Sequence, residues 1–253
     1  MTTTELDLSR PDVSVLRLIA VELRKAVDTR AGRWLLISIG VITLLWDLFW
    51  LGLPQEAHTV TAFLAAPAIL QKPLLGILGI LLATSEWSQR TGMVTFTLVP
   101  KRGRTILAKV VAALLLATLA FGVALLIAAL LAAVSGSSDP WDLPVGTLGQ
   151  AYLGTLISTF QGVAFGLLLL NTPAAIVVYL MASTVVAAVT GLVDALRDVA
   201  PWVDFSGAMS PLVDEVPGSL TAEQWGHLLT ATIIWFVIPF AIGIWRVLNA
   251  EVK

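Results

Sequence analysis

Six long apolar runs, separated by shorter polar segments, dominate the pattern of this chain. They cover residues 34–53, 64–84, 106–134, 152–170, 174–192 and 228–247. A helix needs about 20 mostly apolar residues to cross the hydrocarbon core of a bilayer, and each run is about that long or longer. The pattern therefore predicts six membrane-spanning helices.

A second pattern precedes the first run. Apolar residues recur there at helical spacing, and charged residues take the other side of the helix; the apolar ones are Val13, Leu16, Ala20, Leu23 and Val27. This predicts an amphipathic helix within residues 12–33 that lies on the membrane surface, with its basic side toward anionic head groups. A segment that only anchors the topology explains the pattern equally well.

Composition agrees with a membrane protein. Hydrophobic residues make up 57% of the chain and charged residues 13%, whereas soluble domains carry about 25% charged residues. Repeats and soluble domains are not apparent, so we expect one all-α transmembrane domain over residues 1–253. The chain has no cysteine and only two histidines, so we expect no metal site. We also expect no nucleic-acid partner.

The basic residues are unevenly distributed. All but two of the 15 lysines and arginines lie before the first run, between the second and third or in the first residues of the third, or at the end of the sixth and after it. The exceptions are Lys72 and Arg197. Because basic residues near span ends stay in the cytosol, we expect both termini there and residues 193–226 on the outside.

Residues 85–109 form a charged connector between the second and third runs. Apolar residues in its middle are exposed to the cytosol unless something covers them. A short helix that offers such residues to a groove is an established mode of protein recognition. The sequence therefore predicts partner docking through Glu86, Arg90, Thr91, Met93, Phe96 and Leu98. The alternative is a loop folded against the bundle.

Two loose motifs stand before the first run and after the second. Before the first run, Glu22, Lys25 and Arg30 stand in the order E-x-x-K-x-x-x-x-R. After the second run come Glu86, Thr91, Pro100, Arg102 or Arg104, and Lys109. With six runs and both motifs in order, nearly the whole chain resembles the membrane subunits of ABC-2 type transporters, although Arg90 stands where that family usually has Gly before the Thr.

The resemblance implies a type V exporter-like fold and a permease role in a bacterial cytoplasmic membrane. Two cytosolic ATPase subunits would bind the connector as a coupling helix, and a second membrane subunit, identical or different, would complete the substrate path. The substrate would be hydrophobic or amphipathic: a drug, antibiotic, peptide or lipid.

We expect no enzyme activity and no cofactor on this chain, with ATP and Mg²⁺ on the partner. Independently of the resemblance, the sequence contains no Gly-Lys dipeptide and hence no P-loop. A membrane scaffold or sensor that binds a cytosolic partner without transport is the alternative.

Two charged residues lie inside the apolar runs, away from the ends where the other basic residues gather. Asp47 in the first run and Lys72 in the second are at similar depth when counted from the ends of the runs. Because an unpaired charge in lipid is costly, we predict an ion pair between them. It would serve as a clamp between helices or as part of a substrate or proton path.

Small residues recur in the fifth run. Ser183, Ala187 and Gly191 follow each other at intervals of four. Such a stripe lets another helix backbone approach closely. We predict helix packing along it, against this chain or a second copy.

Overall fold

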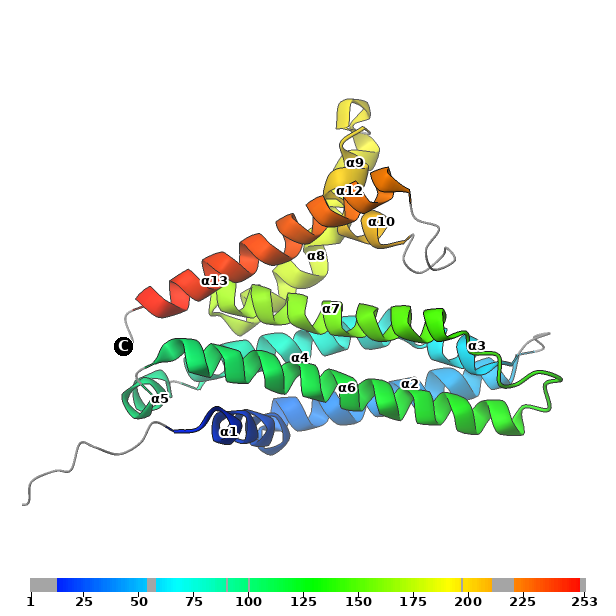
Figure 1. Cartoon of the computed structure of the whole chain (residues 1–253), viewed down its shortest axis with the longest axis horizontal. Helices are drawn as coiled ribbons and strands as arrows, with labels where there is room; N and C mark the ends of the chain where they lie inside the picture. Colours follow the sequence, from blue (N-terminus) through cyan, green and yellow to red (C-terminus); the bar gives the residue numbers. More distant parts are fainter. Residues whose placement is uncertain are drawn as a thin grey trace, which may run out of the picture.

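A computed structural model describes residues 13–53, 58–89, 91–99, 101–196, 198–210 and 221–250, except for the side chains of Phe96 and Asp194. Every regular element in these ranges is helical (Figure 1). The α-helices are α1 (Val15–Asp28), α2 (Arg30–Leu51), α3 (Val60–Ala65), α4 (Ala68–Ser88), α5 (Gly92–Leu98), α6 (Arg102–Val134), α7 (Val145–Leu169), α8 (Thr172–Leu192), α9 (Ala200–Val203), α10 (Phe205–Met209), α12 (Ala222–Thr232) and α13 (Ile238–Asn249). A 3₁₀ turn (Asp194–Leu196) precedes α9, and a π-helical turn (Ile233–Val237) joins α12 to α13.

The six predicted spans are confirmed as helices long and apolar enough to cross a membrane. They are α2, α4, α6, α7, α8 and the continuous segment Ala222–Asn249. The second begins later than predicted because Pro67 separates α3 from α4. The chain is therefore an all-helical, multi-pass membrane protein by the length and composition of its helices.

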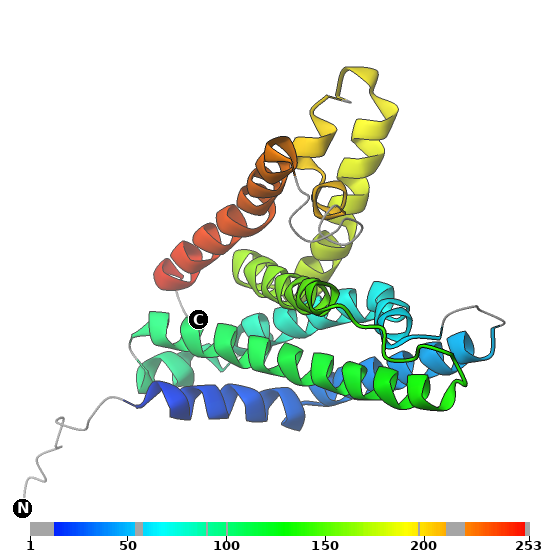
Figure 2. The same ribbon diagram turned by 45° about the vertical axis from the view of Figure 1, so that its right-hand side comes forward.

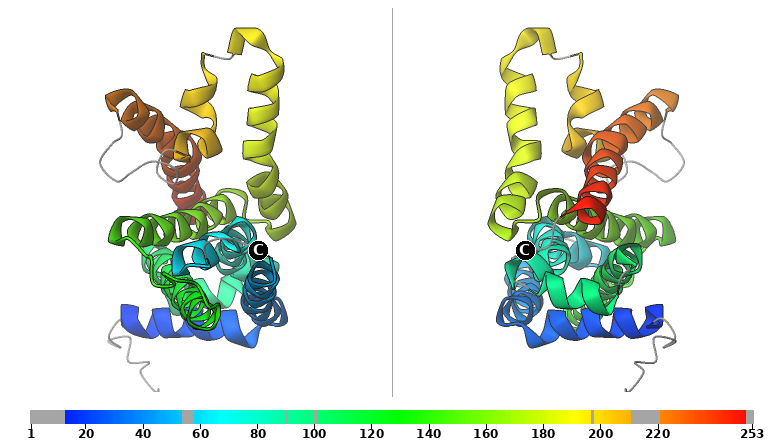
Figure 3. Two further views of the ribbon diagram at one scale, coloured as in Figure 1. Left: turned by 90° about the vertical axis from the view of Figure 1, so that its right-hand side faces the viewer. Right: turned by 90° about the vertical axis from the view of Figure 1, so that its left-hand side faces the viewer.

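Four of these helices, α2, α4, α6 and α7, run side by side, and α1 lies crosswise over one end of them (Figures 1 and 3). We call that end, which also carries α5, the α5 end, and the opposite one the α3 end. Helix α8 and the α12–α13 segment diverge from the other four, as Figure 2 shows. The result is a group of four helices with two diverging arms, one of which packs closely on α7 at its α13 end: a Cβ on Gly243 would lie 2.9 Å from the backbone of Leu167.

The closest helix contact joins α4 to α7 through glycines. A Cβ atom on Gly162 of α7 would lie 1.9 Å from the carbonyl oxygen of Gly76 in α4. One on Gly79 would lie 2.4 Å from the carbonyl oxygen of Thr159. Only glycine permits this approach. Because the hydrophobic effect does not hold helices together inside a bilayer, close backbone packing stabilises the contact instead.

Around this contact, leucines of α4 and α7 form the core. Leu75, Leu78 and Leu82 of α4 and Leu167 of α7 are almost completely buried. By contrast, many apolar side chains on α2 and α8 are exposed. Within a bilayer such residues meet lipid tails, which are as apolar as leucine, so their exposure carries no penalty there.

The predicted amphipathic helix is present as α1, but a different face packs against the bundle. Its buried residues are Glu22 and Ala26, while Leu16 and Val27 of the predicted apolar face are exposed. Ser14 caps its start, and Thr29 both ends α1 and caps α2. Leu23 of the predicted face does pack against the core, so the crosswise helix presents a carboxylate to the bundle together with part of its apolar side.

The segment before the last span is partly described. Of the predicted outer segment 193–226, residues 197 and 211–220 lie outside the described residues. A capping box formed by Thr221 and Gln224 starts α12. The π turn ends two residues before Pro239, whose ring nitrogen has no hydrogen to donate to the preceding helical turn.

Candidate functional site

Four charged side chains meet at the α5 end: Glu22 and Lys25 of α1, Glu86 of α4 and Lys109 of α6. We call them the charge cluster. Its two carboxylates and two ammonium groups balance, and three of the four side chains are buried, with Lys25 part-exposed. Three helices that are far apart in sequence are thus joined by ion pairs.

Lys109 lies at the centre of the cluster. Its Nζ atom is 2.9 Å from Oε2 of Glu22 and 2.7 Å from Oε2 of Glu86. It also donates to the carbonyl oxygen of Leu82 at 2.8 Å and to Oγ of Ser85 at 2.9 Å. A buried ammonium is tolerated only when acceptors surround it in this way.

Lys25 closes the cluster on its exposed side. Its Nζ atom is 2.8 Å from Oε1 of Glu22 and 2.8 Å from Oε1 of Glu86. Burial of the ammonium would lower the pKa of Lys25, but the carboxylates of Glu86 and Glu22 outweigh that effect and raise the pKa above its ordinary 10.5. The resulting stabilisation is present below that ordinary value and is lost only as the pH rises through the higher folded-state pKa.

The cluster unites residues from both sequence motifs. Glu22 and Lys25 are three positions apart on α1, and this spacing puts both on one side of a helix. The other motif residues lie close by. Thr91 precedes α5, and its backbone N–H donates to the carbonyl oxygen of Glu86 at 3.0 Å. Arg30 begins α2 outside the cluster, and Pro100 lies outside the described residues.

The two arginines at the start of α6 hold neighbouring chain ends. Arg102 donates to the carbonyl oxygens of Val247 and Ala250 at 2.7 and 2.8 Å, where α13 ends. Arg104 donates to the carbonyl oxygen of Val13 at 2.5 Å. Cations near a helix C-terminus satisfy its free carbonyls, so these arginines tie α13 and the start of the described chain to α6.

Next to the cluster, α5 presents an exposed apolar surface. Met93 is 61% exposed, Val94 62% and Leu98 71%. We call these three residues the α5 surface. The helix lies between the ends of α4 and α6, and Thr97 is exposed on it together with these apolar residues.

Not all predicted docking residues lie on that surface. Glu86 is 1% exposed and pairs with both lysines, so it supports α5 from within and does not reach a partner. Thr91 is exposed beside the surface. Arg90 and the side chain of Phe96 lie outside the described residues. Val94 was missed by the sequence analysis, although its place next to Met93 was a usable signal.

The predicted ion pair between Asp47 and Lys72 is wrong. Within the described chain no ion pair joins them, and both carboxylate oxygens of Asp47 are buried without a hydrogen-bond partner. The α4 residue that faces α2 is Gln71, which donates to Oγ1 of Thr43 at 3.4 Å. Lys72 is one position further along α4, a rotation of about 100°, and therefore turns toward α7.

The small-residue stripe of α8 is largely exposed in the described part of the chain. Ala187 and Gly191 are exposed, Ser183 is half-buried, and nothing lies within 4 Å of a Cβ placed on Gly191. Packing along it stays a prediction for a second molecule. The glycines that do mediate close packing, in α4 and α7, were missed; Gly162 and Gly166, four apart, were the signal.

Comparison with models of known protein families and with curated protein sequences gives no match. The described ranges also contain no group of three or more His, Asp or Glu side chains that could hold a metal ion. The functional argument therefore rests on the charge cluster and the α5 surface.

Proposed function

We propose that this chain is the membrane permease subunit of an ATP-driven exporter of the ABC-2 type. The observation that carries the proposal is the α5 surface: three exposed apolar side chains on a short helix at the bundle end where basic residues gather. A cytosolic ATPase subunit with an apolar cleft would cover them, as in other helix-in-groove complexes.

The charge cluster supports a coupling role for α5. Glu86 precedes α5 by a few residues, and Lys109 follows it in the third turn of α6. Since ion pairs fix both flanks to α1, a displacement of α5 by a partner would move α4 and α6 together. Packed groups that have two discrete arrangements can transmit a small local shift to distant helices.

The remaining parts of the proposal follow from charge and composition. Both termini and α5 would face the cytosol of a bacterial cell, with ATP and Mg²⁺ bound by two copies of the ATPase subunit. A second membrane subunit, identical or different, would complete the path. An apolar bundle suits a hydrophobic or amphipathic substrate such as a drug, antibiotic, peptide or lipid.

Co-purification tests the proposal. The tagged chain is extracted from its native membrane with a mild detergent, and bound proteins are identified and counted. We expect about one ATPase subunit per chain. Met93→Glu and Leu98→Glu should abolish this binding, because a carboxylate would then be buried in an apolar cleft.

Val145→Glu is the matched control. Val145 is also exposed and apolar, but it begins α7 at the α3 end, so this variant should retain the ATPase. If the wild-type chain brings down a cytosolic protein without ATPase activity, a scaffold or sensor role replaces export. Equal ATPase binding by all variants would remove α5 as the docking site.

A further inference from the structure

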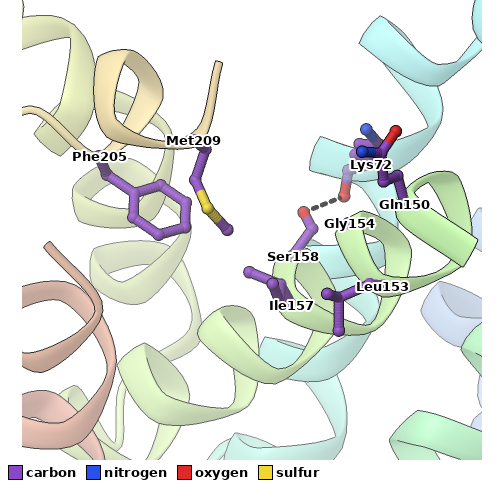
Figure 4. A pocket seen from close by; sticks show the side chains of 8 residues that line it. All are labelled: Lys72, Gln150, Leu153, Gly154, Ile157, Ser158, Phe205 and Met209. Carbon is purple, nitrogen blue, oxygen red and sulfur yellow. Dashed lines mark hydrogen bonds between the residues drawn. The ribbon is translucent and has the colours of Figure 1, made fainter. Parts of the chain in front are cut away.

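Lys72 lies in a crevice at the α3 end of the bundle. Two adjoining cavities, of about 160 and 400 Å³, share Lys72 and Gln150 in their lining. The smaller lies between α7 and α10, and the larger between α3, α4 and α7. Figure 4 shows Lys72 and Gln150 next to each other, with Phe205 and Met209 of α10 facing α7 across the smaller cavity.

The ammonium of Lys72 has no counter-ion in the described chain. No acidic residue is among those that line either cavity. A Cβ on Gly154 of α7 would lie 3.1 Å from the Lys72 Nζ atom, so the missing side chain of that glycine leaves room for the ammonium. An unpaired cation on a membrane-spanning helix is costly, and such residues generally serve a ligand or a path.

The backbone that carries Lys72 is held in place. Ser158 of α7 donates its hydroxyl to the carbonyl oxygen of Lys72 at 2.8 Å, as the dashed line in Figure 4 marks. The same hydroxyl is 2.9 Å from the phenol oxygen of Tyr179 in α8. Three helices therefore fix the position from which the ammonium extends.

The rest of the lining is mainly apolar. Leu153, Ile157, Phe205 and Met209 line the smaller cavity. The apolar part of the larger one comes from three helices: Leu64 and Ala65 of α3, Ala68 and Ile69 of α4, and Ala151 of α7. Ile69 and Leu153 are exposed at the rim, on helices that cross the membrane. The crevice thus opens where lipid would surround the protein.

We propose that this crevice binds an anionic phospholipid of the bilayer. The phosphate would pair with the Lys72 ammonium and accept a hydrogen bond from the Gln150 amide, and an acyl chain would lie along the apolar lining. A zwitterionic lipid fits less well, because its own cation would find no acidic partner there. The inference concerns binding alone and does not require that the chain transports anything.

Lipid retention by the purified full chain tests the proposal. The chain is equilibrated with mixed micelles of phosphatidylglycerol and phosphatidylcholine, and the co-purified lipid is quantified by mass spectrometry. We expect phosphatidylglycerol to be enriched. Lys72→Gln should weaken its retention about fivefold or more, since one basic residue at an anionic membrane surface contributes that much. Lys72→Arg should retain it.

Two further variants make the result decisive. Gly154→Leu keeps the charge but fills the space beside it, and should also release the lipid. Lys101→Gln removes a lysine at the α5 end and should change nothing.

Equal retention of both lipids, or enrichment that survives Lys72→Gln, would overturn the proposal and leave Lys72 as a cation that only reaches for the membrane surface. If Lys72→Gln is not monodisperse, Gly154→Leu decides alone. An absent ATPase partner would refute export without affecting this outcome.

Discussion

At the scale of single residues, the charge cluster makes a sharp prediction for Lys109. Lys109→Met leaves two buried carboxylates with Lys25 as the one cation paired with them in the described chain. Breaking a buried ion pair by removing one side typically costs about 3 to 5 kcal/mol. We expect a correspondingly lower thermal unfolding temperature in detergent, measured by intrinsic tryptophan fluorescence.

The control is Arg33→Met, which removes a positive charge at an exposed position near the start of α2 and should leave the unfolding temperature nearly unchanged. The double variant Glu86→Gln with Lys109→Met removes one charge of each sign and should recover part of the loss. If the unfolding temperature of the double variant instead falls by the sum of the decreases in the single variants Glu86→Gln and Lys109→Met, charge balance does not explain the cluster.

The sequence indicated the members of this cluster but not their contacts. Glu22, Lys25, Glu86 and Lys109 were named through motif positions, and nothing in one sequence says that α1 crosses the bundle where α4 and α6 meet. The mistaken pairing of Asp47 with Lys72 has a related cause. Depth in the membrane is read by counting residues, whereas the direction of a side chain depends on which face of its helix packs.

At the scale of helices, the α4–α7 contact predicts opposite effects for one substitution at two sites. Gly162→Ala places a Cβ against the backbone of Gly76, which cannot move aside as a flexible side chain would. Overpacking of this kind costs about 1 to 3 kcal/mol, so the unfolding temperature should fall. Gly122→Ala in α6 meets nothing within 4 Å and should be neutral or slightly stabilising, since alanine favours helix.

Both variants can be measured in the same detergent by the same fluorescence assay. An unchanged unfolding temperature for Gly162→Ala would mean that α4 and α7 are further apart than described. A loss of stability in Gly122→Ala would point to a neighbour on α6 that belongs to another molecule.

Helices were easier to predict than their faces. Runs of about 20 apolar residues identify spans because the bilayer sets their length, and this held for all six. The amphipathic helix α1 was predicted, but its packed face differs from the expected one: Glu22 and Ala26 face the bundle and Leu16 is exposed. Next to lipid, apolar residues need not face protein, so periodicity alone does not show which side packs.

At the scale of the whole molecule, the arrangement of the spans was beyond the sequence. Nothing in the apolar pattern of α8 distinguishes it from α4, yet α4 is central and α8 diverges from the group (Figure 2). Glycine positions contribute to this difference. The backbones of α4 and α7 meet at Gly76 and Gly162, whereas α8 reaches Gly76 through the Tyr179 side chain and its own Gly191 has no neighbour within 4 Å. The order of packing therefore depends on pairs of residues far apart in the chain.

Orientation in the membrane is the property on which the proposed function depends most, and the chain is well suited to measure it. It contains no cysteine, so a single introduced thiol reports without background. Lys101→Cys marks the α5 end outside the docking surface, and Val145→Cys marks the α3 end; both positions are exposed. In intact cells a membrane-impermeant maleimide should label Val145→Cys, and Lys101→Cys only after permeabilisation, because basic residues concentrate at the α5 end. The reverse labelling would put the α5 surface outside the cell, where no ATP-hydrolysing subunit reaches it. Export driven from α5 would then be ruled out, whereas the fold and the Lys72 crevice would be unaffected.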